Sequence, residues 1–243
     1  PSGESSRGTT MPFFLRKRPG PSAASILGIS ESLEVRRVDV KLGKQLGKGA
    51  FGSVFQAQWF TADDREVIEC AAKKVILDRA QDPGCISERM TLLRNEVSIW
   101  GKVDHPNLLK FFGVCLERED YLLLCELMEG GTLCDVHKRY RKEKIQPACD
   151  VNLYEKLLQL ASGMEYLHSR WIIHRDLKPA NILITRDGDR LAISDFGLAR
   201  LYDIGKDGDM TAETGSYRYM APEVIRHEPY SKPCDVYSFA LVI

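Results

Sequence analysis

The segment His174-Arg175-Asp176-Leu177-Lys178-Pro179-Ala180-Asn181 is the most informative stretch of this chain of 243 residues. It consists mostly of polar and charged residues, and Pro179 excludes a continuous helix. Apolar triplets flank it at residues 171–173 and 182–184, and both are typical of short strands. A solvated hairpin turn would explain the polarity. The long apolar flanks instead favour a charged loop held close to the protein interior.

A second acidic loop follows 14 residues after Asn181, where Asp195-Phe196-Gly197 succeeds the apolar stretch at residues 191–193. If the two loops are adjacent, Asp176 supplies a base, and Asn181 and Asp195 supply oxygen ligands. A hard cation such as Mg²⁺, bound through few protein oxygens together with nucleotide phosphates, requires such a ligand set.

A glycine-rich stretch, Gly47-Lys48-Gly49-Ala50-Phe51-Gly52-Ser53-Val54, lies between two segments of alternating polarity at residues 38–42 and 53–59. Glycines allow the backbone N–H groups to approach a phosphate without obstruction by a Cβ atom. A dinucleotide-binding fingerprint would run from a strand into a helix, whereas this stretch runs from strand to strand. The pattern therefore favours a β-hairpin lid over phosphates.

Lys73 and Glu96 are two charged residues in apolar surroundings. Lys73 lies on a third expected strand, residues 67–76, and its neighbours are small or apolar. Glu96 lies on the apolar face of a helix expected between residues 86 and 103. A strand lysine is most often a surface residue. Here each charge needs a partner, and we expect the two to form an ion pair.

The order of the expected elements predicts an α+β protein in two lobes. Strands with one helix fill residues 38–125, a hinge occupies residues 126–131, and mainly helical sequence follows at residues 132–243. Residues 1–37 are expected to form a disordered tail, because fourteen of the first 30 residues are Pro, Gly or Ser.

Composition excludes several classes of protein. The chain has 34 Lys and Arg and 34 Asp and Glu, so bulk charge gives no reason to expect a nucleic-acid partner. No apolar run is long enough for a membrane-spanning helix. Seven scattered cysteines without a Cys-x-x-Cys pair favour a reducing compartment, so we expect a cytoplasmic, intracellular location. The basic residues 138–144 are interpreted as a solvated surface loop.

Six motifs in this order resemble the eukaryotic-type protein kinase catalytic domain, over residues 40–243. They are the glycine loop, the Ala-x-Lys strand, the helix glutamate, the His-Arg-Asp loop, Asp-Phe-Gly, and Ala-Pro-Glu at residues 221–223. The resemblance implies a bilobal fold with a β-rich N-lobe containing one helix and a mainly helical C-lobe. It also implies ATP as co-substrate, Mg²⁺ as cofactor, and protein substrates.

The resemblance assigns roles to individual residues. Lys73 would bind the α- and β-phosphates and pair with Glu96, Asp176 would accept the proton of the substrate hydroxyl, and Asn181 and Asp195 would hold Mg²⁺. Together with Lys178, the residues Asp176, Lys73 and Glu96 form the expected catalytic set. The expected nucleotide-binding residues are Leu46, Gly47, Gly49, Gly52, Val54, Ala71, Lys73, Cys125, Glu126, Met128 and Leu183, with Leu127 beside them.

Two positions within this resemblance are unusual. Cys125 stands at the gatekeeper position of the nucleotide site, where it would be small and oxidisable. Trp100 stands where the family usually places a smaller apolar residue behind Phe196. The resemblance therefore does not predict the packing behind Phe196.

The substrate class follows from Lys178, which serine/threonine-directed members of the family carry two residues after the catalytic aspartate. Residues 215–224 are similar to the tyrosine-kinase-like group, including Raf-like and integrin-linked-like members, which are serine/threonine kinases. The resemblance therefore implies ATP-dependent transfer of phosphate to Ser and Thr hydroxyls of proteins. The alternative is a pseudokinase-like binding or scaffold module, which the intact Lys73, Asp176 and Asp195 disfavour.

Regulation is expected in the segment between Asp195 and Glu223. Arg175 is interpreted as an unpaired cation until an anionic group joins it, and phosphorylation of Thr211 or Thr214 by an upstream kinase would supply that charge. The alternative is that both threonines are only turn residues and are not phosphorylated.

Kinase domains of this family continue beyond the helix that starts near Asp235, so the C-lobe is expected to be incomplete. The chain alone is then expected to fold poorly or expose apolar surface, and to be inactive through truncation.

Overall fold

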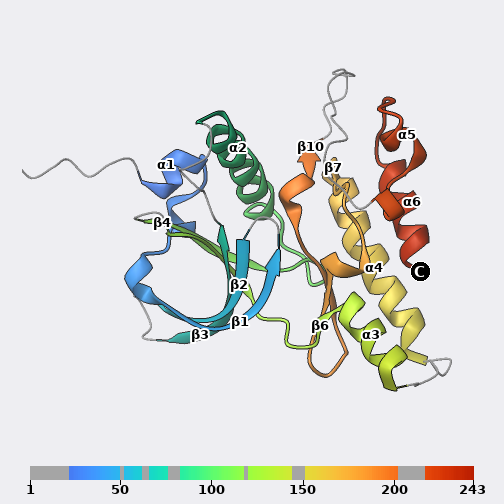
Figure 1. Cartoon of the computed structure of the whole chain (residues 1–243), viewed down its shortest axis with the longest axis horizontal. Coiled ribbons are helices and arrows are strands. Elements are labelled where there is room, and N and C mark those ends of the chain that lie inside the picture. Colours follow the sequence, from blue (N-terminus) through green and yellow to red (C-terminus); the bar gives the residue numbers. More distant parts are fainter. Residues whose placement is uncertain are drawn as a thin grey trace, which may run out of the picture.

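The computed structural model describes residues 22–49, 52–61, 66–75, 83–117, 120–143, 151–201 and 217–243. A five-stranded antiparallel sheet and helix α2 form one lobe, and most of the remaining helices form the other (Figure 1). The α+β, two-lobed fold predicted from the sequence is confirmed.

The N-lobe sheet has the strand order β1-β2-β3-β5-β4. Its strands are β1 (Val40–Gly49), β2 (Gly52–Phe60), β3 (Val67–Val75), β4 (Phe111–Glu117) and β5 (Asp120–Glu126). The register places Lys73 opposite Val54 on one side and Leu123 on the other. Helix α2 (Pro83–Trp100) connects β3 to β4 and carries Glu96. The three strands and the helix predicted within residues 38–103 are therefore present. Strand β1 continues to Gly49, well beyond its predicted end at residue 42, and the other ends differ by three residues or fewer.

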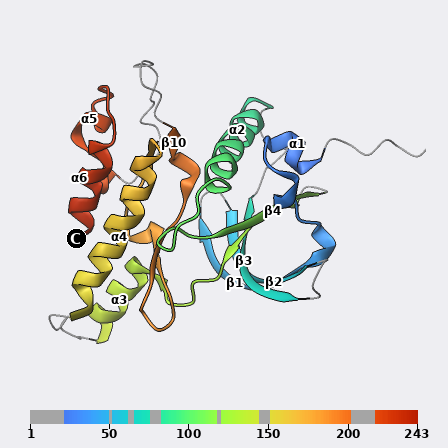
Figure 2. The ribbon, with the colours of Figure 1, turned by 180° about the vertical axis from the view of Figure 1, so that it is seen from behind.

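The C-lobe contains α3 (Leu133–Glu143), α4 (Val151–Ser169), α5 (Pro222–Ile225) and α6 (Pro233–Val242). Its short strands form two small sheets, β6-β8-β9 and β10-β7, with bounds β6 (Gly131–Thr132), β7 (Ile172–Ile173), β8 (Ile182–Ile184), β9 (Leu191–Ile193) and β10 (Arg200–Leu201). Strand β7 directly precedes residues 174–181 and strand β8 directly follows them, so both ends of this loop are anchored in a sheet. Seen from behind, α4 lies between the strands and α6 (Figure 2).

The N-terminal boundary differs from the prediction. Residues 22–39, which we call the strap, were expected to belong mostly to the disordered tail, but they form the helix α1 (Ala23–Leu27) and two 3₁₀ turns (Glu31–Leu33 and Arg37–Asp39). Ser22 and Ser30 cap the first two through their hydroxyl groups. Composition did not predict the strap, because the burial of Ala24, Leu27 and Val35 comes from contacts with the distant elements α2 and β4. The expected disorder of residues 1–21 lies outside the described residues.

Helix α3 corrects a second prediction. The basic residues from Lys138 to Glu143, interpreted as a loop, belong to this helix, and their side chains are exposed as expected. The carboxylate of Asp135 accepts bonds from the N–H and hydroxyl of Thr132 and so fixes the start of the helix.

Val236 and Leu241 of the C-terminal helix α6 are exposed, as is Ile243 directly after it, which agrees with the predicted apolar surface at this end. Whether the chain folds poorly for that reason stays a prediction. In the part of the chain that the structure describes, none of the helices has the length and apolar character needed to cross a bilayer.

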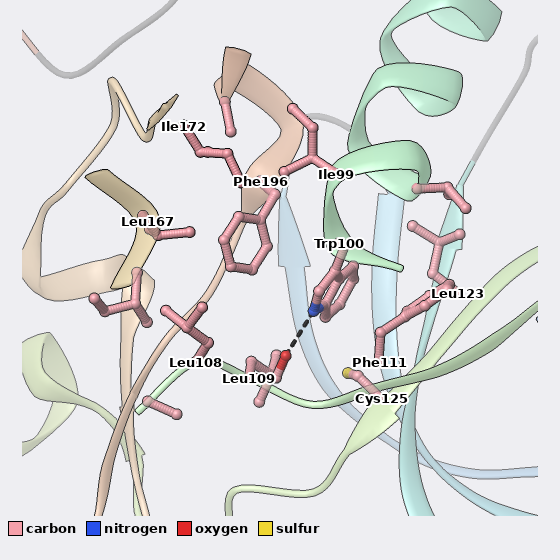
Figure 3. Packing of buried hydrophobic residues seen from close by; sticks show 14 of the residues in the cluster. Ile99, Trp100, Leu108, Leu109, Phe111, Leu123, Cys125, Leu167, Ile172 and Phe196 are labelled. Carbon is pink, nitrogen blue, oxygen red and sulfur yellow. Dashed lines mark hydrogen bonds between the residues drawn. The ribbon is translucent and has the colours of Figure 1, made fainter. Parts of the chain in front are cut away.

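Trp100, at the end of α2, lies at the centre of the largest buried cluster (Figure 3). Its ring centroid is 4.9 Å from that of Phe111 and 5.9 Å from that of Phe196. The indole Nε1–H donates to the carbonyl oxygen of Leu109 at 2.6 Å. The large residue is accommodated because the ring fills the space between Phe111 and Phe196 while its polar atom stays hydrogen-bonded.

We expect Trp100→Phe to lower the free energy of unfolding by about 1–3 kcal/mol, because the buried Leu109 carbonyl loses its donor. Urea unfolding measures the change. Trp59→Phe is the matched control, because this half-buried ring stacks on Phe112 at 6.2 Å. Equal losses in the two variants would contradict the role given to the hydrogen bond.

Candidate active site

A cavity of about 330 Å³ lies between the two lobes. Its lining includes all of the expected nucleotide-binding residues except two glycines, together with residues that were not predicted. The predicted lining residues are Leu46, Gly47, Val54, Ala71, Lys73, Cys125, Glu126, Met128 and Leu183, with Leu127. Gly49 and Gly52 are not among the lining residues. Gly52 has a φ of +147°, and a Cβ there would lie 2.0 Å from the carbonyl oxygen of Lys74, so the hairpin requires glycine at this position.

The lining residues that were not predicted as nucleotide-binding include Thr132 and Asp135, at the start of α3, and Ala180 and Ser194 beside the catalytic loop. An Asp four residues after a Gly-Gly pair is a weak signal in a single sequence. Only the packing of α3 against the loop places it at the cavity.

Lys73 and Glu96 form the ion pair expected from the sequence. The Lys73 Nζ donates to the Glu96 Oε1 at 2.6 Å and lies 3.7 Å from the Asp195 Oδ1. The side chains of Lys73 and Glu96 are 21% and 8% exposed. Burial opposes the charged form of Lys73, but the two carboxylates outweigh it and raise the lysine pKa. Burial raises the pKa of Glu96, and the lysine charge opposes that shift. Lys73 is therefore a cation that Glu96 holds in a fixed position at the cavity.

The side chain of Asp176 is held by two donors. The Lys178 Nζ donates to its Oδ2 at 2.6 Å, and the Asn181 Nδ2 donates to the same oxygen at 2.9 Å and to the Asp176 carbonyl oxygen at 2.8 Å. These contacts leave the Oδ1 of Asp176 without a donor among the described residues. The loop therefore presents a carboxylate oxygen in a fixed direction beside a lysine.

Two residues of the site adopt left-handed backbone conformations that only glycine adopts without cost. Arg175 and Asp195 both have a φ of +67°. Such conformations cost about 1–3 kcal/mol each and persist only where the surroundings fix them. Here they occur directly before Asp176 and at Asp195 itself, the two acidic positions of the site.

Asp235 supports the catalytic loop, and sequence reasoning missed this role. Its carboxylate is fully buried and accepts bonds from the backbone N–H groups of His174 and Arg175, both at 2.8 Å. His168 Nε2 lies 2.8 Å from the same carboxylate. The available signal was an aspartate within the otherwise apolar α6 segment, because a buried carboxylate needs donors.

Arg175 is hydrogen-bonded in the structure, but the two partners are uncharged. Its Nε donates to the Leu198 carbonyl oxygen and its Nη1 to the Tyr230 hydroxyl, both at 2.7 Å. Burial raises the pKa of Tyr230, so this hydroxyl is neutral, and within the described residues Arg175 has no carboxylate partner. The candidate phosphorylation sites Thr211 and Thr214 lie outside the described residues.

Arg190, which follows the catalytic loop in the sequence, holds the hinge residue Glu126 in place. Its guanidinium pairs with the Glu126 carboxylate and donates to the Pro106 carbonyl oxygen at 2.7 Å. Glu126 also accepts a bond from the Lys110 N–H at 2.8 Å. Next to it, burial raises the pKa of the Cys125 thiol well above its ordinary value, so Cys125 is a neutral apolar wall of the cavity.

The oxygen donors at the cavity suit a hard divalent cation. Both bonds of the Asn181 amide nitrogen go to Asp176, which leaves the Asn181 Oδ1 free of donors from the described residues. The Asp195 side chain is 41% exposed, and Gly197 leaves room beside it, because a Cβ there would lie 3.3 Å from the Asp195 Oδ1. An amide oxygen and a carboxylate are ligands that Mg²⁺ accepts.

The family profile described as protein kinase domain matches residues 40–243. Serine/threonine-protein kinase VIK of Arabidopsis thaliana is 38% identical over 219 residues, which are 87% of this chain and 46% of that protein. Serine/threonine-protein kinase STY17 of the same organism is 35% identical over 88% of this chain and 34% of its own length. Mitogen-activated protein kinase kinase kinase 1 of Mus musculus is 37% identical over 83% of this chain and 13% of its own length.

The chain therefore belongs to the protein kinase domain family. These relatives are of types that belong to the tyrosine-kinase-like group, which confirms the predicted resemblance. The chain spans less than half of the length of each of the three relatives.

Proposed function

We propose that this protein is an ATP-dependent serine/threonine protein kinase that transfers the γ-phosphate of ATP to Ser and Thr hydroxyls of proteins. The observation that carries the proposal is the convergence of the Lys73–Glu96 pair, Asp195 and the Asp176–Asn181 loop around one interlobe cavity. The names of the serine/threonine kinase relatives support the same reaction.

The adenine ring would lie between Val54 and Ala71 on one side and Leu183 on the other, against the hinge residues 126–128. Lys73, held by Glu96, would bind the α- and β-phosphates and reduce their mutual repulsion. Gly47 would let the strand backbone approach the phosphates. Bound Mg²⁺, held by Asn181 and Asp195, supplies positive charge for the transferred phosphoryl group.

Asp176 would orient the substrate hydroxyl and accept its proton through the carboxylate oxygen that Lys178 and Asn181 leave free. Lys178 would remain beside the transferred phosphate as a compensating cation. The lysine also supports Ser or Thr as the accepting residue, as it does in the serine/threonine-directed members that the sequence resembles.

Three further assignments belong to the proposal. Phosphorylation of Thr211 or Thr214 by an upstream kinase would bring an anion to Arg175, which has no carboxylate partner in the described part of the chain. The free cysteines of the described residues, among them Cys70 and Cys125, support an intracellular, cytoplasmic location. The substrates and partners of the whole protein are expected to be other proteins of a signalling pathway.

Incubation of the full chain with labelled ATP, Mg²⁺ and a general protein substrate tests the function. We expect labelled phosphoserine or phosphothreonine that is lost in Asp176→Asn and when EDTA removes the metal. A folded protein that binds MgATP but transfers no phosphate would contradict the proposal and favour a scaffold module. Label on tyrosine alone would contradict the residue class.

A further inference from the structure

The strap (residues 22–39) makes specific contacts with the helix that carries Glu96. In both views α1 lies beside α2, on the side of the lobe away from the hinge (Figures 1 and 2). Leu27 is buried in the same cluster as Val97 and Trp100 of α2. Among the described elements, α2 has its most extensive contacts with the turn Phe196–Leu198, with β10 and with α1. Two of these three elements, the turn and β10, belong to the segment that follows Asp195. The third, α1, belongs to the strap at the other end of the described chain.

Two glycines allow the strap to approach closely. A Cβ on Gly101, directly after α2, would lie 2.9 Å from the Leu33 Cδ1. A Cβ on Gly113 of β4 would lie 2.6 Å from the Leu33 carbonyl oxygen and 2.7 Å from the Val35 Cγ2. All three separations are shorter than real Cβ contacts. A larger residue at Gly113 would therefore meet the strap backbone and displace it, whereas one at Gly101 would push the Leu33 side chain aside.

The strap is also hydrogen-bonded to the sheet. Strand β4 is the edge of the five-stranded sheet, and Glu34 forms a parallel bridge with Val114. The Val35 N–H donates to the Val114 carbonyl oxygen at 2.8 Å, and the Arg37 N–H donates to the Glu117 carboxylate at 3.0 Å. The strap thus covers an edge that would otherwise present unpaired backbone groups. It is bound to the sheet at one end and packed against α2 at the other.

We propose that the strap is a positioning element for the Lys73–Glu96 pair, with Leu27 and Leu33 as positioning residues. Because Lys73 belongs to the sheet and Glu96 to α2, the 2.6 Å contact requires a fixed distance between the two elements. The strap is attached to both. Without its contacts, α2 moves away from the sheet for part of the time, and Lys73 is not oriented for the nucleotide phosphates. The inference rests on the proposed kinase function for its activity readout.

The test compares the full chain with the double variant Leu27→Ala/Leu33→Ala, which we call the strap variant. Both proteins are prepared with Glu96 intact and with Glu96→Gln. The KM and kcat for ATP and the Kd for MgADP are measured. With Glu96 intact, we expect the strap variant to raise the KM and the Kd about tenfold and to change kcat less, because a less populated competent state lowers apparent affinity. In the Glu96→Gln background the same variant should change either constant by no more than about twofold, since it acts through Glu96.

Val38→Ala is the matched control, because Val38 belongs to the strap but is 82% exposed, and it should leave all three constants unchanged. A purely structural role predicts a lower kcat at constant KM, from loss of folded protein, in both Glu96 backgrounds. That result, or constants equal to those of the unaltered chain, would overturn the inference.

If the double variant does not fold, Leu33→Ala alone provides the same comparison, because Leu33 is only partly buried. A chain that transfers no phosphate contradicts the proposed function but leaves the inference measurable through the MgADP affinity.

Discussion

Asp176→Asn should lower kcat about 10²–10⁴-fold while the KM for ATP changes by less than about twofold. The factor is the usual contribution of a positioned general base, which the neutral amide cannot replace. The KM should be preserved because Asp176 does not line the nucleotide cavity. Steady-state phosphorylation with varied ATP measures both constants.

The substitution keeps the size of the side chain, so Lys178 and Asn181 can retain contacts near it. Asp189→Asn is the matched control, because it makes the same chemical change at an exposed position in the turn between β8 and β9. It should leave kcat unaltered. A loss of only a few fold in Asp176→Asn would show that Asp176 orients the hydroxyl without accepting its proton.

The amino-acid sequence predicts those parts of the fold and site that depend on neighbouring residues. Alternating polarity locates β1 and β2, and the helical period locates α2, because these patterns report which side chains are buried. The pairing of Lys73 with Glu96 is predictable in the same way, because each is a charge in an apolar segment. The confirmed pairing follows from the cost of burying either charge alone.

Other features depend on contacts between distant segments, which no local pattern records. Leu33 and Val35 can pack where they do only because Gly101 and Gly113 leave space for the strap. Arg175 obtains its partners from Leu198 and Tyr230, which are 23 and 55 residues later in the chain. Helix α3 was missed for a different reason. All of its residues are at least partly exposed, so charge dominates its pattern.

The second large effect concerns the ion pair. Lys73→Met should lower kcat/KM for ATP about 10²–10³-fold, the usual result of removing one group that stabilises developing charge. It should also lower the free energy of unfolding by about 3–5 kcal/mol, because Glu96 is left buried without its cation. The double variant Lys73→Met/Glu96→Leu should recover most of that stability, since apolar side chains often replace a buried ion pair without loss. It should recover none of the activity.

Urea unfolding and steady-state kinetics on the same preparations separate the two effects. Lys74→Met removes an equal charge from the next residue of β3, whose side chain points to the other face of the sheet, and should keep kcat/KM within about twofold. If the double variant regained activity together with stability, the lysine would serve only the packing of α2 against the sheet. Stability without activity instead requires Lys73 to act on the nucleotide itself, because the helix is then held in place without the charge.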